Sequence, residues 1–264
     1  MEFPFGNWLT GGNILLGRHP FYLNLQGWTN ISKNTDGEMK DKDWIEKTLF
    51  SSTESEADAQ IAILDVSLLY NFWQGDKPWG DIGDKFQKGW VGFLIGYKYE
   101  NFKYDIIGVR DVLAGGNYYS GEKVLDYKIK YQIPYLGLNW QYYNDVGYKV
   151  LDRWGVNVLA CVSPYVIAKD RDDHILRNKV IHGNSKGYGF LMGLNTFFNT
   201  KNHWIYRLGL DCTYINTDGK QKQYWYGDDP ASPGYDDTGG SIEGINLKIE
   251  SSQFLFWGLL QYKF

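Results

Sequence analysis

The chain has 264 residues, of which 43% are hydrophobic and 17% aromatic, yet its mean hydropathy is only −0.42. No segment approaches the roughly 18 unbroken apolar residues of a membrane-spanning helix, and the net charge of −4 argues against nucleic acid as a partner. Apolar residues diluted among polar ones are typical of two-faced strands. These occur in a transmembrane β-barrel and also in an aromatic-rich soluble β-sandwich.

Alternation with a period of two residues predicts about nine strands. In one of them, apolar residues at odd positions from Tyr127 to Tyr135 alternate with polar ones, and we interpret Lys128 and Lys130 as charges that face the lumen. The aromatic-rich last strand favours a lipid-facing outer surface. The predicted strands lie near 3–17, 21–36, 58–73, 88–108, 122–142, 147–168, 179–199, 203–218 and 242–264.

The predicted connections are of two kinds, which is the pattern of outer-membrane barrels with long loops outside. Because closed bacterial barrels have an even number of strands, we expect a further strand before residue 1. The expectation is therefore one all-β domain over residues 1–264, an antiparallel transmembrane barrel that is N-terminally truncated. Short connections lie at 18–20, 143–145 and 200–202, and long polar ones at 37–57, 109–121, 169–178 and 219–241.

Two acidic clusters could carry chemistry. Asp41 and Asp43 lie in the first long loop, and Asp170, Asp172 and His174 lie at the rim of another. In an extended segment, residues two apart share a face. A carboxylate beside an imidazole orients it as a base, and paired carboxylates raise each other's pKa. Together these are the parts of a water-activating hydrolytic site.

Simpler interpretations stay open for acidic residues. Either cluster alone would be typical of a solvated loop, and Asp-x-Asp spacing also suits Ca²⁺, although no complete calcium loop follows. We interpret the pairs Asp228–Asp229 and Asp236–Asp237 as a solvated or cation-binding loop tip, and we expect no metal in the hydrolytic site.

The chain resembles the omptin family of outer-membrane proteases, because matching stretches of sequence occur in the family's order and at about its spacing. Four stretches carry the resemblance: GEMKDKDWI at 37–45, DYKIKYQIPYLGL at 126–138, DRDDH at 170–174 and GLLQYKF at 258–264. It implies a ten-stranded, monomeric barrel of the bacterial outer membrane with its site facing outward. It also implies cleavage of extracellular polypeptides next to basic residues, with lipopolysaccharide as an activating lipid and no other cofactor.

The resemblance also implies roles for individual residues. Asp41 and Asp43 match the family's aspartate pair, and Asp172 with His174 matches its Asp–His dyad. His174 would take a proton from a water held between the two pairs, and that water would attack the scissile carbonyl. Asp170 matches a residue that receives the basic side chain before the scissile bond.

Three departures from the family pattern follow. The family's second pocket acid comes from a segment before residue 1, so selectivity here depends on Asp170. The stretch at 50–57, FSSTESEA, lacks the aspartate and histidine that the family carries there. Continuing the alternation from Val156 and Val162 would point Asp172 and His174 outward, so we predict a β-bulge between 162 and 170, near Pro164.

Two other functions remain as alternatives. A barrel of this lineage could be a non-catalytic adhesin or structural protein whose site residues have diverged. A small pore is disfavoured, because barrels of this size fill their lumen with side chains.

Overall fold

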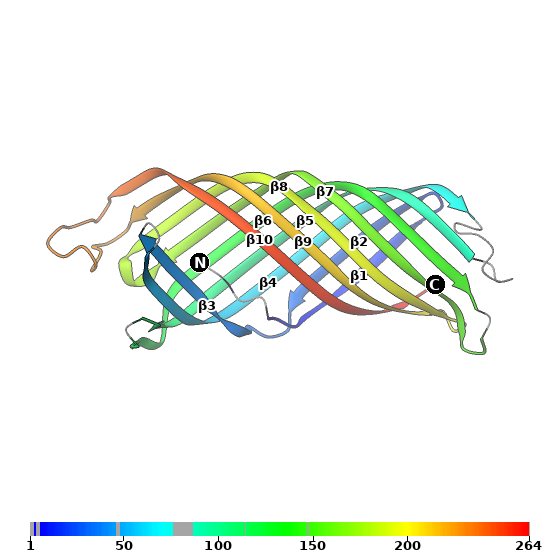
Figure 1. Cartoon of the computed structure of the whole chain (residues 1–264), viewed down its shortest axis with the longest axis horizontal. Helices are drawn as coiled ribbons and strands as arrows, with labels where there is room; N and C mark the ends of the chain where they lie inside the picture. The colour runs from blue at the N-terminus through cyan, green and yellow to red at the C-terminus, as the bar shows by residue number, and fades with distance from the viewer. Residues whose placement is uncertain are drawn as a thin grey trace.

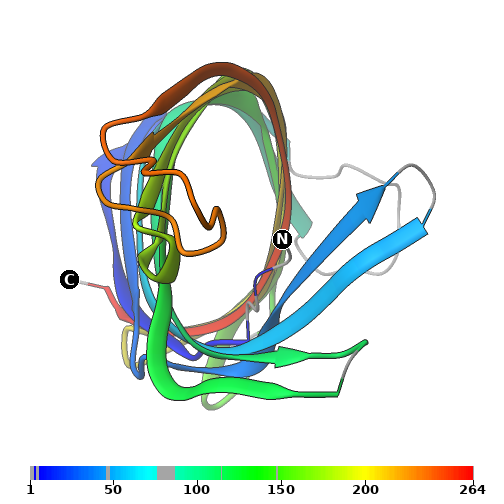
Figure 2. The same ribbon diagram turned by 90° about the vertical axis from the view of Figure 1, so that its left-hand side faces the viewer.

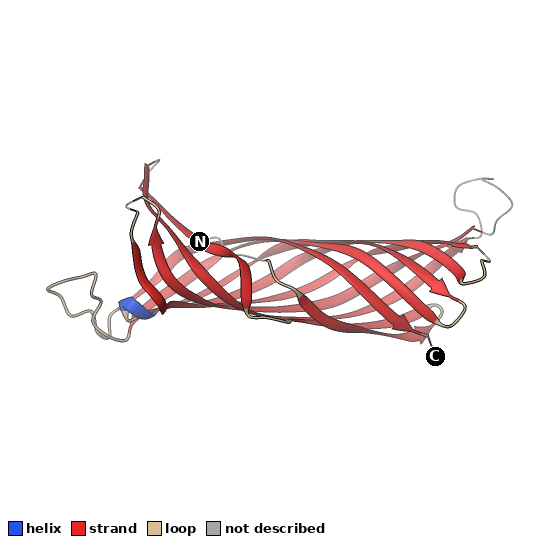
Figure 3. Cartoon of the chain, turned by 90° about the horizontal axis from the view of Figure 1, so that it is seen from below, coloured by secondary structure: helices blue, strands red, loops and turns tan. Residues whose placement is uncertain are grey.

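The computed structural model describes residues 3, 6–45, 48–75, 87–113, 115–146 and 148–263. Strands make up most of this part of the chain, and its one helical element is a 3₁₀ turn, η1 (Ile175–Arg177), as Figure 3 shows. None of the helical structure described there is long and apolar enough to cross a membrane. The strands are β1 (Leu9–Arg18), β2 (Phe21–Asn30), β3 (Asn34–Ile45), β4 (Thr48–Gly75), β5 (Gln87–Asp111), β6 (Asn117–Asp145), β7 (Leu151–His174), β8 (Lys179–Thr200), β9 (Trp204–Trp225) and β10 (Ser241–Tyr262).

All ten strands belong to one antiparallel sheet that curves into a cylinder (Figures 1 and 2). The order follows the chain, except that β2 and β3 both pair with the long strand β4. β2 and β3 therefore occupy one position in the sheet as a single interrupted strand. Counted in this way the sheet has nine strand positions, which confirms the predicted number of about nine strands. β1 and β10 are the two edges of the sheet, and a further strand that would close it stays a prediction.

The strands extend further than predicted, so all four interpretations of long polar segments as loops were wrong in part. Residues 37–45 and 48–57 form the β3–β4 hairpin, 109–111 and 117–121 belong to β5 and β6, 169–174 complete β7, and 219–225 complete β9. Period-2 alternation of apolar residues fades in such segments where both faces of a strand meet water or polar groups. The acidic clusters therefore lie on strands, not on loops.

The outer surface carries a belt of exposed apolar side chains around the middle of the sheet, as a lipid-facing surface requires. It includes Phe93 and Ile95 of β5, Leu136 and Leu138 of β6, Phe190 and Met192 of β8, Leu208 and Leu210 of β9, and Phe254 and Phe256 of β10.

Towards the end of the barrel that carries η1, the apolar residues change face. On β6, Leu136 and Leu138 point outward, whereas Tyr127, Ile129 and Ile133 are buried inside. The pairing of β5 with β6 is regular from Gln87 to Ile106, so no bulge causes this change. The strands leave the lipid and enclose an apolar core, which also contains Phe102, Tyr104, Ile106, Tyr131, Val166 and Ile215.

The position of this core shows that one prediction made from the sequence was wrong. Because the odd-numbered residues of this part of β6 face inward, the even-numbered Lys128 and Lys130 lie on the outer face and not in the lumen. The error came from assuming that the apolar face of a barrel strand always meets lipid.

Candidate active site

The candidate dyad lies at the end of β7. His174 is the last residue of the strand, and its Nε2 lies 3.1 Å from Oδ2 of Asp172. The Asp172 side chain is 5% exposed and that of His174 is 22% exposed, so the carboxylate is buried while the imidazole still reaches the solvent at the mouth. If Nε2 donates its proton to Asp172, the lone pair of Nδ1 is left available as a base.

A β-bulge turns this dyad inward. Between Ser163 and Val166, β7 has one residue more than either β6 or β8 opposite it. Pro164 and Tyr165 are both exposed, and the buried positions change from Cys161 and Ser163 to even-numbered residues from Val166 onward. The predicted irregularity between 162 and 170 is thereby confirmed, and it brings Asp170, Asp172 and His174 to the inner face.

Asp170 lies two residues below Asp172 on the same face, outside the apolar belt. Its Oδ1 is buried and has no hydrogen-bond partner among the described residues. Burial, with a further contribution from the charge of Asp172, raises the pKa of Asp170 to about 6. A carboxyl group in this state would gain from a cationic partner.

An aromatic floor lies beneath the three residues. Tyr127 of β6 is paired across the sheet with Asp172 and is stacked by Phe3 at 4.2 Å. Burial, followed by the negative charge of Asp170, raises the pKa of Tyr127 well above its ordinary value. Its hydroxyl group therefore stays protonated, and its ring belongs to the apolar core below.

A clasp fastens the segment after His174 to the loop at 226–240. Arg177 of η1 donates to Asp229 from Nε at 3.0 Å and from Nη2 at 2.7 Å. Trp225 Nε1 and the backbone N–H of Ala231 donate to the same carboxylate. The Asp229 side chain is fully buried, so the interpretation of this residue as a solvated loop tip was wrong.

Sequence reasoning missed this clasp, since nothing in the spacing of Arg177 and Asp229 pairs them. Lys179, which is paired with His174 across the sheet, is another buried charge that it missed. Burial, and then the positive charge of Arg177, lowers the pKa of Lys179. Its ammonium group lies 5.8 Å from the centre of the Trp225 ring.

The aspartate pair lies on the β3–β4 hairpin, at the same end of the barrel as η1 (Figure 1). Asp41 is partly buried and pairs with Thr53 across the hairpin, and Asp43 pairs with Ser51. The side chain of Asp43 falls outside the described part of the structure. Viewed end-on, the hairpin leans outward from the ring of strands (Figure 2). The meeting of this pair with the dyad around one water stays a prediction.

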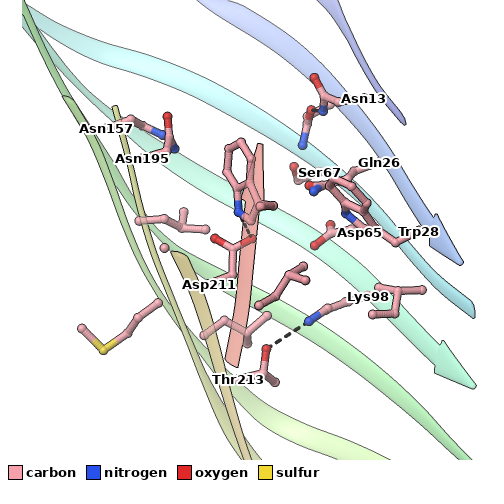
Figure 4. A pocket seen from close by; sticks show the side chains of 18 of the residues that line it. Asn13, Gln26, Trp28, Asp65, Ser67, Lys98, Asn157, Asn195, Asp211 and Thr213 are labelled. Atoms are coloured by element: carbon pink, nitrogen blue, oxygen red, sulfur yellow. Dashed lines mark hydrogen bonds between the residues drawn. The ribbon is translucent and has the colours of Figure 1, made fainter. Parts of the chain in front are cut away.

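A second polar cluster fills the lumen at the level of the belt, around a cavity of about 450 Å³ (Figure 4). Two of its charged groups have polar partners there: Lys98 contacts Glu100 at 2.7 Å and Thr213 at 3.0 Å, and Asp211 accepts a hydrogen bond from Trp257. We assign this cluster a structural role. In the described part of the chain, no group of three or more His, Cys, Asp or Glu side chains could hold a metal ion.

The cylindrical sheet, the apolar belt and the inward-facing dyad together define a transmembrane β-barrel with a candidate catalytic site at one mouth. The omptin family model matches residues 16–246, and the chain belongs to that family. It is 24% identical over 169 residues to the plasminogen activator of Yersinia pestis, covering 62% of this chain and 50% of that protein. It is 24% identical over 242 residues to protease 7 of Escherichia coli O157:H7, covering 85% and 70%. The chain thus spans about half the length of the first of these relatives.

Among solved structures, the outer membrane protease OmpT from Escherichia coli matches with a TM-score of 0.74 at 17% identity. The match covers 97% of this chain and 83% of that one. It establishes the omptin barrel fold predicted from the sequence.

Proposed function

We propose that this protein is an outer-membrane endopeptidase that hydrolyses extracellular polypeptides next to basic residues. The observation that carries the proposal is the contact between His174 and Asp172, turned into the mouth of an omptin barrel by a bulge. The curated relatives named above, a protease and a plasminogen activator, support the same class of activity.

In the proposed mechanism, His174 accepts a proton from a water molecule as that water attacks the scissile carbonyl carbon. The tetrahedral intermediate collapses with loss of the amine, which takes the proton from the imidazolium. Asp172 orients the ring and stabilises its positive charge. Asp41 and Asp43 would hold the water from the opposite side. No acyl-enzyme forms, because the nucleophile is water.

Asp170 would bind the basic side chain that precedes the scissile bond. A guanidinium group supplies the hydrogen bonds that its buried Oδ1 lacks. The acidic pocket and the dyad share one face of β7, two residues apart, so a residue bound by Asp170 would place its own peptide bond near His174.

Lipopolysaccharide is proposed as the activating lipid, and a basic surface supports this. Lys128 and Lys130 of β6 are paired with Arg171 and Lys169 of β7, and all four lie on the outer face beyond the apolar belt. Phosphate groups of a lipid headgroup would meet these cations there. Nothing in the proposal requires more than one copy of the chain.

The proposal is tested with purified protein in detergent micelles, with and without lipopolysaccharide, on a peptide that contains adjacent basic residues. Cleavage next to a basic residue that depends on the lipid supports it. A folded barrel that cleaves nothing under either condition would instead favour the non-catalytic adhesin or structural protein.

A further inference from the structure

Gly183 of β8 lies directly across the sheet from Asp170, and both positions face the interior of the barrel. A Cβ atom added at Gly183 would overlap Oδ1 of Asp170 and lie within 2.8 Å of its Cγ. It would also lie 2.5 Å from Cδ2 of Leu247, on β10. The carboxylate thus occupies the space that any other side chain at this position would take.

Backbone conformation does not explain this glycine. Gly183 is absent from the glycines with positive φ, such as Gly244 at 78°, so other residues could adopt its conformation. A glycine inside a strand weakens the strand, because it is flexible and packs nothing. The remaining reason for a glycine at this position is room for its neighbours.

We propose that Gly183 is a positioning residue that determines specificity by letting the carboxylate of Asp170 lie against the barrel wall, open to an arginine or lysine side chain. Leu247 supplies an apolar surface for the methylene groups of that side chain. This inference rests on the proposed function, and it adds a residue that never touches the reacting atoms.

The test is Gly183→Ala. Both atoms that the new methyl group would meet most closely are ends of flexible side chains, so the barrel folds and the carboxylate of Asp170 turns away. Two peptides are compared that differ only in arginine or glutamine before the scissile bond. The ratio of their kcat/KM values is expected to fall at least about tenfold, which corresponds to the partial loss of one charged contact.

Two variants serve as controls. Gly258→Ala adds a methyl group that meets only Leu208 Cδ2 at 3.5 Å and a carbonyl oxygen at 4.0 Å, and its ratio should equal that of the wild type. In the background of Asp170→Ala, adding Gly183→Ala should change the ratio no further. A further fall would show that Gly183 acts by general distortion and would overturn the inference.

The outcomes separate the inference from the function on which it rests. If Asp170→Ala keeps the wild-type ratio, the basic pocket itself is wrong. If that variant loses the preference while Gly183→Ala keeps it, only the inference is wrong. Calorimetric titration with argininamide decides the matter without catalysis: binding at least about tenfold weaker to Gly183→Ala than to the wild type supports it, and equal binding to both proteins, or no binding to the wild type, overturns it.

Discussion

Breaking the clasp at Asp229 should loosen one loop and disturb the candidate base without unfolding the barrel. In Asp229→Ala, Arg177 loses its carboxylate, and two neutral donors, Trp225 Nε1 and the N–H of Ala231, lose their acceptor. The remaining ties between loop and turn are weaker. They include the bonds from Tyr226 N to Asn178 O and from Asn178 Nδ2 to Asp228 O.

The free energy lost in Asp229→Ala depends on how far water can replace the broken hydrogen bonds. The Arg177 side chain is 44% exposed, so water compensates much of its loss and its contribution is discounted to about 1–2 kcal/mol. The two neutral bonds contribute about 0.5–1 kcal/mol each. The sum is about 3 kcal/mol, which raises the population of the open loop about 100-fold.

The pH of the measurement matters. Hydrogen bonding from Arg177 lowers the pKa of Asp229, so this carboxylate stabilises the folded state above its unfolded pKa of about 3.9. That contribution is lost only as the pH falls through the lower, folded-state value. Near neutrality the clasp is complete.

Amide hydrogen exchange at neutral pH measures the opening of the loop directly. Exchange over residues 226–240 should accelerate about 100-fold in Asp229→Ala, while the strands of the barrel keep their protection. Asp236→Ala is the control, because Asp236 only accepts a bond from Thr238 within the same loop. Because η1 follows His174 directly, kcat should fall as well. Unchanged exchange over the loop would refute the clasp.

Three further outcomes are expected. His174→Ala should lower cleavage about 10²–10⁴-fold with the barrel folded, and retained activity would remove this imidazole from the mechanism. The preference for arginine over glutamine should weaken below about pH 6, where Asp170 is protonated, and a preference constant from pH 8 to 5 would contradict the pocket. Lys98→Met should destabilise the barrel by about 3–5 kcal/mol, because Glu100 is left charged and buried. Adding Glu100→Gln should restore most of that loss in thermal unfolding, and failure to do so would contradict the ion pair.

The sequence was sufficient to predict the strand segments that lie within the lipid, because the lipid outside imposes the alternation of apolar and polar residues there. It also predicted the bulge, since Pro164 interrupts a pattern that would otherwise send two acidic-site residues into the wrong environment. It could not predict the β3–β4 hairpin as strand, where polar residues on both faces remove the signal. Nor could it pair Arg177 with Asp229, because that contact depends on how a long loop folds back.

In this barrel the apolar residues of a strand can switch between odd- and even-numbered positions for either of two physical reasons. On β7 the chain itself shifts, since one extra residue between Ser163 and Val166 exchanges the two faces. On β6 the chain is regular, and the surroundings change from lipid outside to a protein core inside between Leu136 and Tyr135.

The partner strand distinguishes these causes, because a bulge interrupts the register and a change of surroundings does not. Together, the bulge on β7 and the change of surroundings along β6 explain the location of the site. Beyond the belt the interior becomes an apolar core, and the bulge turns three polar residues of β7 onto that core. There the Asp172 side chain is only 5% exposed while that of His174 is 22% exposed, so the carboxylate is withdrawn from water and the imidazole is not. The apolar core beneath the dyad therefore contributes to the burial of Asp172 on which the proposed chemistry depends.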